Sequence, residues 1–231
     1  HRVAEGWVFG FPELEPKRRE ELRHAMRVTN PGCYSTGFLA IVRVLTRAGI
    51  VPTDYPILCN AVSGYSGGGK KLIAAFEDAN APDATDSNFY LYGLGLQHKH
   101  VPEIQKQGSL ARRPIFVPSV GRFAQGMIVS LPLHLWALPG APKIADVYAA
   151  LADHYTGRDG AKGVTVASPK ESAAYKDKLD AEDLKDTDGM IVHVFASEAH
   201  QQVVICAVLD NLGKGASGQA VQNLELMLGL G

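Results

Sequence analysis

The sequence of 231 residues predicts an α/β or α+β protein, and three observations support this prediction. Segments with apolar residues at helical spacing alternate with apolar runs of strand length. The composition, 46% hydrophobic and 20% charged, is that of a globular chain that can bury a sizeable core. The sequence also contains no internal repeat and no low-complexity tract. We therefore expect one large domain, or one domain with part of another.

The predicted elements follow from periodicity and from the residues that interrupt it. Apolar residues at helical spacing predict helices at 17–27, 33–48, 70–78, 143–155 and 216–228. Apolar runs predict strands at 57–62, 115–120, 127–135, 191–196 and 202–209. Gly49 and Pro52 mark the end of the second helix. Two polar stretches, 80–88 and 176–189, are expected to be surface loops with solvated charges.

Charge and cysteine content exclude several classes of protein. A formal net charge of -1 gives no reason to expect a nucleic-acid partner or an anionic membrane surface. No apolar run approaches the roughly 18 residues needed to cross a bilayer. Three cysteines, an odd number spread widely, do not form a disulfide framework, so we predict a reducing, cytoplasmic location. The chain starts at His1 rather than Met and carries no recognisable signal peptide.

One cysteine lies in the stretch VTNPGCYSTGFLA, between a turn and a predicted helix. An Asn-Pro-Gly triplet initiates the turn, and the helical pattern begins at Cys33. Unpaired N–H groups and the positive end of the helix dipole favour a thiolate in a first turn. We therefore predict that Cys33 is a reactive nucleophile. Cys59 and Cys206 lie inside apolar runs and are expected to be buried packing residues.

The stretch YGLGLQHKHVPEIQKQG contains two histidines and a glutamate close together. His98 and His100 share a face of an extended segment, and Pro102 at a helix start would bring Glu103 near them. Such a cluster could hold a metal, supply a general base, or lie on a solvated surface. A zinc site lacks a third ligand at a recognisable spacing, so acid/base catalysis ranks above it. A cysteine nucleophile needs such a proton shuttle.

Two glycine-rich stretches each follow a predicted strand and precede a predicted helix. In SGYSGGGKKLI, Lys71 stands where a P-loop requires a hydroxyl, which excludes the P-loop interpretation. The stretch remains either an anion-binding loop at a helix N-terminus or an ordinary turn. Gly213, Gly215 and Gly218 have the G-x-G-x-x-G spacing, but no further strand with an acidic residue follows them. This second motif therefore does not define a complete dinucleotide-binding unit.

Five motifs occur in one order: VTNPGCYSTG, SGYSGGG, QHKHVPEI, VPSVGRFAQGM and DNLGKGASGQAVQN. In these motifs, over nearly the whole chain, the sequence resembles the N-acetyl-gamma-glutamyl-phosphate reductase family of the aspartate-semialdehyde dehydrogenase superfamily. The resemblance implies an α+β catalytic and dimerisation domain at 33–210, with a mixed sheet and helices on one face. It also implies remnants of an NADP-binding Rossmann domain at 1–32 and a C-terminal helix at 211–231 that returns to that domain.

Family members begin with a nucleotide-binding βαβ unit, and no such unit precedes His1. We therefore expect an N-terminally truncated chain. Such a chain should bind NADPH weakly or not at all and should self-associate through the exposed apolar face of its last helix.

The resemblance implies a reaction and its residues. N-acetyl-glutamyl 5-phosphate would be reduced to the 5-semialdehyde with release of phosphate, in arginine biosynthesis, through a thioester on the cysteine and with NADP(H) as cofactor. The expected catalytic residues are Cys33, His98, His100, Asn30 and Glu103. The expected substrate-binding residues are Arg122, Arg112, Gln125 and Tyr34, with Arg113 as a further candidate. The expected cofactor-binding residues are Ser63, Gly64, Tyr65, Ser66, Gly67, Asn211, Lys214 and Gly215.

Within this scheme, the Asn30 side chain and the Cys33 backbone N–H are the expected donors to the tetrahedral oxygen, and Glu103 is the expected orienting partner of the histidines. The resemblance further implies a small acyl-phosphate substrate and a homo-oligomer, either a dimer or a tetramer. Two alternatives stay open. A sibling reductase acting on aspartyl or aminoadipyl phosphate would share the thiol chemistry. A cofactor-free Cys/His hydrolase or acyltransferase is the less favoured alternative.

Overall fold

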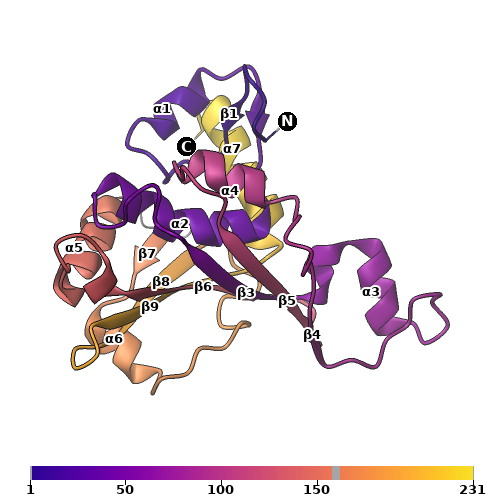
Figure 1. Cartoon of the computed structure of the whole chain (residues 1–231). Coiled ribbons are helices and arrows are strands. Elements are labelled where there is room, and N and C mark those ends of the chain that lie inside the picture. Colours follow the sequence, from indigo (N-terminus) through magenta and orange to yellow (C-terminus); the bar gives the residue numbers. More distant parts are fainter. Residues whose placement is uncertain (1, 158–161, 231) are drawn as a thin grey trace.

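A seven-stranded mixed β-sheet forms the centre of the computed structural model, which describes residues 2–157 and 162–230 (Figure 1). Its strands are β3 (Leu58–Gly64), β4 (Phe89–Leu91), β5 (Ile115–Gly121), β6 (Met127–His134), β7 (Val164–Val166), β8 (Met190–Ser197) and β9 (Gln202–Leu209). Their order across the sheet is β4-β5-β3-β6-β9-β8-β7. The pairs β3·β5 and β7·β8 are parallel, and the other neighbours are antiparallel. A separate parallel pair is formed by β1 (Val8–Phe9) and β2 (Val28–Thr29).

Helices cover one face of this sheet, and one helix lies on the other. They are α1 (Arg18–Arg23), α2 (Cys33–Arg47), α3 (Lys70–Glu77), α4 (Val101–Gln107), α5 (Ile144–Tyr155), α6 (Pro169–Ala174) and α7 (Gly218–Met227). In Figure 1, α2, α4 and α5 lie above the sheet, whereas α6 lies below it and contacts β8. Short turns η1 (Tyr65–Gly68), η2 (Leu135–Ala137) and η3 (Gly213–Ser217) complete the chain, and η3 is a π-helical turn.

Helix α2 is the centre of the core because 11 of its 15 residues are buried. Every residue from Tyr34 to Val42 is buried, and the helix contacts α4, α5, β6 and β9. Its approach to β6 is close, since a Cβ added to Gly37 would lie 2.7 Å from Cγ2 of Val129. The helix ends just before Gly49, which adopts φ +72°. Packing along the helix therefore fixes the position of its N-terminus, where Cys33 lies.

The N-terminal and C-terminal segments lie side by side, at the top of Figure 1. Helix α1 contacts α7. Asn223 of α7 donates hydrogen bonds from Nδ2 to the carbonyl of Gly10 (2.9 Å) and to Oδ1 of Asn30 (3.0 Å). The two ends of the chain therefore meet beside the turn that precedes α2.

The predicted fold class is confirmed, with two qualifications. The predicted placement of helices on one face of the sheet is correct for α2, α4 and α5, but α6 packs on the opposite face. Each predicted strand lies within two residues of an observed one, while β1, β2, β4, β7 and α6 are too short to show a periodic pattern. The first predicted helix ends early, at Arg23, and the last begins as the π turn η3. Among the described helices, none is long and apolar enough to cross a membrane.

Candidate active site

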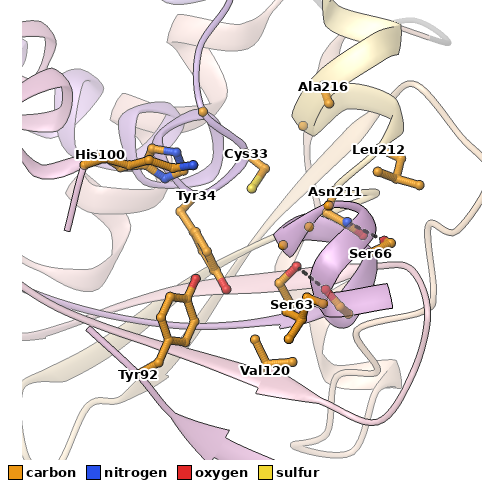
Figure 2. Close-up of a pocket in the computed structure, with 18 of the residues that line it drawn as sticks. Cys33, Tyr34, Ser63, Ser66, Tyr92, His100, Val120, Asn211, Leu212 and Ala216 are labelled. Atoms are coloured by element: carbon orange, nitrogen blue, oxygen red, sulfur yellow. Dashed lines mark hydrogen bonds between the residues drawn. The ribbon is translucent and has the colours of Figure 1, made fainter. Parts of the chain in front are cut away.

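A cavity of about 830 Å³ opens at the N-terminus of α2 (Figure 2). Its walls come from the turn before α2, the end of β3 with the glycine loop that follows, α3, β4, the segment before α4, and the junction between β9 and α7. These segments are far apart in the sequence, and the edge of the sheet brings them together. A cavity of this size and varied lining is typical of a small-molecule site.

Cys33 is the first residue of α2 and is partly exposed to the cavity. The preceding residue, Gly32, is the N-cap, and its backbone N–H donates to Oε1 of Glu103 (2.8 Å). On the other side, Gly215 lies so close that an added Cβ would be 2.9 Å from Cβ of Cys33. The cysteine is therefore held between α4 and η3, with its thiol directed into the cavity (Figure 2).

The predicted preference for a thiolate at Cys33 is wrong, because burial outweighs the effect of the helix start. Burial raises the pKa of the Cys33 thiol from its usual 9.0 to about 11. The backbone N–H groups of Tyr34 and Cys33 and the charges of Arg2 and Lys99 lower this pKa, but they do not offset the loss of hydration. The helix start thus supplies the predicted donors, but the thiol remains protonated near neutral pH. The pKa values of Cys59 and Cys206 are also raised by burial.

The two histidines of the H-K-H motif have different surroundings. The ring of His100 packs on the backbone before the cysteine, because a Cβ on Gly32 would lie 2.2 Å from its Nε2. Its Nδ1 is buried and has no hydrogen-bond partner among the described residues. The backbone N–H of His100 donates to Nδ1 of His98 (3.2 Å), so neutral His98 carries its proton on Nε2.

Burial keeps both imidazoles neutral. Burial, with smaller contributions from protonated His98 and from the charges of Arg2 and Lys99, lowers the pKa of His100 from 6.5 to about 3. It also lowers the pKa of His98, with a smaller contribution from Lys99. The resting site therefore combines a neutral thiol with two neutral imidazoles, each of which retains a proton-accepting capacity.

Aromatic rings separate the histidines from the sheet. The ring of Tyr34 lies 6.0 Å from that of His98, 5.9 Å from that of His100 and 5.2 Å from that of Phe116. Its hydroxyl donates to the carbonyl of Ser119 (3.0 Å). Tyr92, the residue after β4, faces the same space, with its ring 6.5 Å from that of Tyr34 (Figure 2). This wall is apolar in its body and carries hydroxyl groups at its edge.

The far end of the cavity is formed by the glycine loop after β3. Asn211 fixes this loop, since its Oδ1 accepts the N–H of Gly126 (2.7 Å) and its Nδ2 donates to Oγ of Ser66 (2.9 Å; Figure 2). Gly67, Gly68 and Gly69 line the cavity and leave their backbone uncovered. At Gly69, φ is +74° and an added Cβ would meet no atom within 4 Å. Bare backbone before a helix fits the phosphate or amide groups of a dinucleotide.

Three cations and one carboxylate line the cavity. The cations are Arg2, Lys71 and Lys99, and the acid is Asp83. Within the described part of the chain, only Arg2 of these cations forms an ion pair, from Nη1 to Oε2 of Glu103 (3.2 Å). The lining therefore favours an anionic ligand.

Most of the predicted site residues reach this cavity. Those that line it are Asn30, Cys33, Tyr34, Ser63, Gly64, Ser66, Gly67, His98, His100, Asn211 and Gly215. Their placement in one cavity follows from the motif order, but the lining does not test the role of each residue.

The predicted substrate-binding arginines do not reach the cavity. The exposed Arg122 donates to the carbonyls of Phe76, Thr85 and Ser87 and lies over the ring of Phe76 (5.2 Å). It holds the loop at 80–88 against the sheet, and it does not line the cavity. Arg112 is exposed away from the cavity, and Arg113 donates to the carbonyl of Leu96 (3.0 Å).

Gln125 is likewise occupied elsewhere, because its side-chain amide donates to Asp186 (3.2 Å) and Asp210 (2.5 Å). Tyr65 turns away from the cavity, where its hydroxyl donates to Glu77 (2.9 Å) and its ring stacks on Phe76. Neither residue lines the predicted site.

Two further predicted residues act through the backbone or the core. Glu103 accepts the backbone N–H of Gly32 and pairs with Arg2, so it holds the start of α2. The predicted contact with a histidine ring is not formed. Burial raises its pKa, and the Gly32 hydrogen bond partly offsets that rise. Lys214 is fully buried behind η3 and does not reach the cavity. For both residues, tertiary contacts outweigh the position in the motif.

Several residues of the cavity escaped the sequence prediction. Lys99 lies inside the H-K-H motif and could have been singled out as a cation between two histidines. Tyr90 lies in the three-residue strand β4 and Tyr92 just after it, and Arg2 lies in a segment without a motif, so the sequence pattern gave no signal for these residues. Across residues 2–157 and 162–230, no group of three or more His, Cys, Asp or Glu side chains is arranged to hold a metal ion.

Comparisons with known proteins agree with this geometry. The family model for the semialdehyde dehydrogenase dimerisation domain matches residues 33–211. Aspartate semialdehyde dehydrogenase II from Vibrio cholerae has a TM-score of 0.69 at 18% identity, covering 98% of this chain and 70% of that one. The aspartate semialdehyde dehydrogenase of Francisella tularensis has a TM-score of 0.67 at 10% identity, covering 96% and 71%. At these identities the two structures show the fold alone.

Closer relatives come from sequence comparison. The N-acetyl-gamma-glutamyl-phosphate reductases of Brucella ovis and Brucella melitensis are each 56% identical to this chain over 229 residues. The match covers 99% of this chain and 73% of each relative. Fold and cavity thus define a protein of the semialdehyde dehydrogenase class, with a cysteine at a helix start beside two histidines. Within that class, the chain belongs to the N-acetyl-gamma-glutamyl-phosphate reductase family.

Proposed function

We propose that this protein catalyses the NADPH-dependent reduction of N-acetyl-glutamyl 5-phosphate to the 5-semialdehyde, with Cys33 as the nucleophile. The observation that carries the proposal is the position of Cys33, at the start of α2 in one cavity with both histidines and the glycine loop. Relatives that are 56% identical to this chain are named as the reductase of this substrate. The reaction would serve arginine biosynthesis.

The first step is attack by the Cys33 sulfur on the acyl carbon, which forms a C–S bond and releases phosphate. Because the thiol is neutral at rest, its proton must leave as the bond forms. His100 is the proposed acceptor, since its neutral ring packs against Gly32 and points towards Cys33 in Figure 2. The negative charge of the substrate phosphate beside this ring would raise its low pKa and favour the protonated form. The product of this step is a thioester on Cys33.

The tetrahedral oxygen needs hydrogen-bond donors in both halves of the reaction. The backbone N–H groups of Cys33 and Tyr34 face the sulfur and are the first candidates. The Nε2–H of His98 is a second, because Nδ1 of that ring already accepts a backbone N–H. Asn30 offers less than predicted, since its Nδ2 donates to the carbonyl of Ala216 (2.8 Å) and has only one hydrogen left.

NADP(H), when bound, supplies the hydride that reduces the thioester. The residues that fit it are the bare glycines at 67–69, Ser63 and the wall formed by Asn211 and Gly215. These groups would bind and orient it through backbone donors and one amide. Asp83 and Lys71 lie at the same end of the cavity.

The anionic substrate is matched by the cations of the lining. We assign the phosphate to Lys99 and Arg2, whose charges reach Cys33 and His100. This arrangement replaces the clamp expected from Arg122 and Arg112. Tyr34 and Tyr92 would enclose the acyl chain.

The proposal extends to domains and assembly. We divide the chain as predicted, with residues 33–210 as the catalytic unit and the segments 1–32 and 211–231 as parts of a cofactor-binding unit.

The sheet face opposite α2 leaves apolar side chains accessible, and Leu58, Ile115 and Val204 are its exposed members. A homodimer through this face follows from that surface and from the dimerisation domain of the family. Val204→Glu should shift the protein towards a monomer in size-exclusion chromatography, whereas Met26→Glu should not.

The test of the function is the oxidation of NADPH by the full-length protein with defined acyl phosphates. We expect oxidation with N-acetyl-glutamyl 5-phosphate, and a kcat/KM for aspartyl phosphate at least about 100-fold lower, because one lost polar contact already changes specificity on this scale. Cys33→Ser should abolish the activity. Equal use of aspartyl phosphate would favour the sibling reductase, and phosphate release without NADPH oxidation would favour the hydrolase.

A further inference from the structure

A lysine is completely buried behind the wall of the cavity. Lys214 lies in the π turn η3 and has no exposed surface. Its ammonium donates three hydrogen bonds, to Oε2 of Glu13 (3.0 Å), Oε1 of Gln222 (2.9 Å) and the carbonyl of Lys162 (2.5 Å). All three protons are therefore used, and none is directed at the cavity.

The acceptors of Lys214 form one network that joins the two ends of the chain. Oε1 of Glu13 accepts from Nε2 of Gln222 (2.6 Å), and Gln219 donates to Oε1 of Gln222 (2.9 Å). Glu13 is 1% exposed, so both charges of the ion pair are buried. Burial of an ion pair costs desolvation energy that an apolar pair of similar size would not, so stability alone does not account for it.

The same turn presents its other side to Cys33. Gly215 lies within van der Waals reach of the cysteine, and the carbonyl of Ala216 accepts from the side chain of Asn30 (2.8 Å). Gly215 and Ala216 line the cavity beside Cys33, and Ala216 is labelled near this cysteine in Figure 2. One turn thus carries the buried ion pair on one side and part of the reaction site on the other.

A π turn, in which each N–H donates to the carbonyl five residues earlier, is a rare conformation, and several contacts hold η3 in it. The N–H of Gly215 donates to the carbonyl of Asp210 (2.8 Å). The start of the turn is fixed by Asp210, whose Oδ1 accepts from the N–H groups of Leu212 (2.7 Å) and Gly213 (3.2 Å). After Gly213, the side chain of Lys214 extends from the turn into the core. Single π turns inside helices are often found at functional sites.

We propose that Lys214 is a positioning residue for Cys33: its ion pair with Glu13 holds η3 so that Gly215 and Ala216 close the cavity beside the thiol. This proposal rests on the proposed function, in which Cys33 is the nucleophile. It assigns to Lys214 an indirect role in place of the contact with the cofactor that the motif suggested.

The test compares Lys214→Met with a matched control, Lys162→Met. Lys162 pairs with Glu225 of α7 (2.5 Å), so the control also removes the charge of an ion-paired lysine, here one bound to the helix that follows η3. The control keeps the Lys162 carbonyl that accepts from Lys214, and the Lys162 side chain that it changes bonds to Glu225 and not to η3. We expect Lys214→Met to lower kcat by roughly 10- to 100-fold, the scale of a misplacement of about 1 Å, with KM for the acyl phosphate changed less than about threefold. Lys162→Met should retain kcat within about twofold.

A second readout does not depend on turnover. Iodoacetamide should alkylate Cys33 of Lys214→Met roughly fivefold or more faster than in the wild type, because the wall beside the thiol withdraws. Cys59 and Cys206 should remain unlabelled, as they are buried in the sheet. Labelling of all three cysteines at once would mean general opening of the fold and would overturn the positioning role.

The double variant Glu13→Gln/Lys214→Met separates positioning from stability. It removes both buried charges, so Tm should recover towards the wild type relative to Lys214→Met alone. Under the proposal, kcat and the alkylation rate of Cys33 stay at the level of Lys214→Met. Recovery of kcat together with Tm would overturn it, and so would an unchanged alkylation rate in Lys214→Met. Absence of reductase activity in the wild type would contradict the proposed function, while the alkylation rates would still test the position of η3.

Discussion

The protonation state of Cys33 can be measured through its reaction with iodoacetamide at different pH values. Burial raises the pKa of this thiol to about 11, compared with 9.0 for an unperturbed cysteine. At pH 7 the thiolate fraction is then about one in 10,000, roughly 100-fold below that of the unperturbed thiol. A more basic thiolate is also a better nucleophile, and a Brønsted slope of about 0.4–0.5 restores roughly eightfold. Cys33 should therefore react roughly tenfold more slowly than a free cysteine at pH 7.

The pH dependence provides the sharper test. We expect the alkylation rate of Cys33 to rise about tenfold per pH unit from pH 7 to about pH 10, because only the thiolate reacts. Peptide mass spectrometry would follow Cys33 separately, with the buried Cys59 and Cys206 as internal controls. A rate that is constant between pH 5 and 8, as a preformed thiolate–imidazolium pair would give, would refute a neutral resting thiol. A rate above that of free cysteine would do the same.

Three further perturbations follow from the geometry of the site. The pKa of His100 is about 3 in the folded state and 6.5 in the unfolded state, so the unfolded state takes up the proton first as the pH falls. The folded state therefore loses about 1.4 kcal/mol of stability for each pH unit below 6.5. His100→Gln should remove this loss and flatten the dependence of Tm on pH between about 6 and 4. Parallel Tm curves for the two proteins would contradict this. Gly32→Ala should lower the free energy of unfolding by about 1–3 kcal/mol and remove most of the activity, since the added Cβ would lie 2.2 Å from Nε2 of His100. Gly95→Ala is the control: its Cβ would meet no atom within 4 Å, so stability and activity should stay unchanged. Lys99→Gln should raise KM for the acyl phosphate roughly 5- to 20-fold with little change in Tm, because the variant removes a cation from the cavity lining. The control is Lys70→Gln, because Lys70 does not line the cavity. An unchanged KM in Lys99→Gln would show that Lys99 does not bind the substrate.

The sequence predicted those parts of the site that depend on local signals. The turn before α2, the helix start at Cys33 and the glycine closing that helix are each encoded by a few consecutive residues. The motif order also identified the residues that meet in the cavity, including His98 and Asn211. Local patterns therefore placed Cys33, the proposed nucleophile, at a helix start that lines the cavity.

The parts that the sequence could not predict depend on contacts between distant residues. Lys214 and Glu13 are 201 positions apart, and no pattern indicates that a motif lysine turns into the core. Arg122 resembles a substrate clamp in sequence, but the carbonyls of the loop at 80–88 use its guanidinium. The pKa of Cys33 was predicted in the wrong direction, because the helix start is visible in the sequence and the degree of burial is not.

The central claim is that Cys33 carries the acyl group, and one measurement tests it directly. The protein is incubated with N-acetyl-glutamyl 5-phosphate without NADPH, quenched with acid to preserve a thioester, and digested for peptide mass spectrometry. We predict an N-acetyl-glutamyl adduct on the peptide containing Cys33, absent from Cys33→Ser and removed by hydroxylamine. An adduct on any other residue, or persistent labelling of Cys33→Ser, would contradict the account.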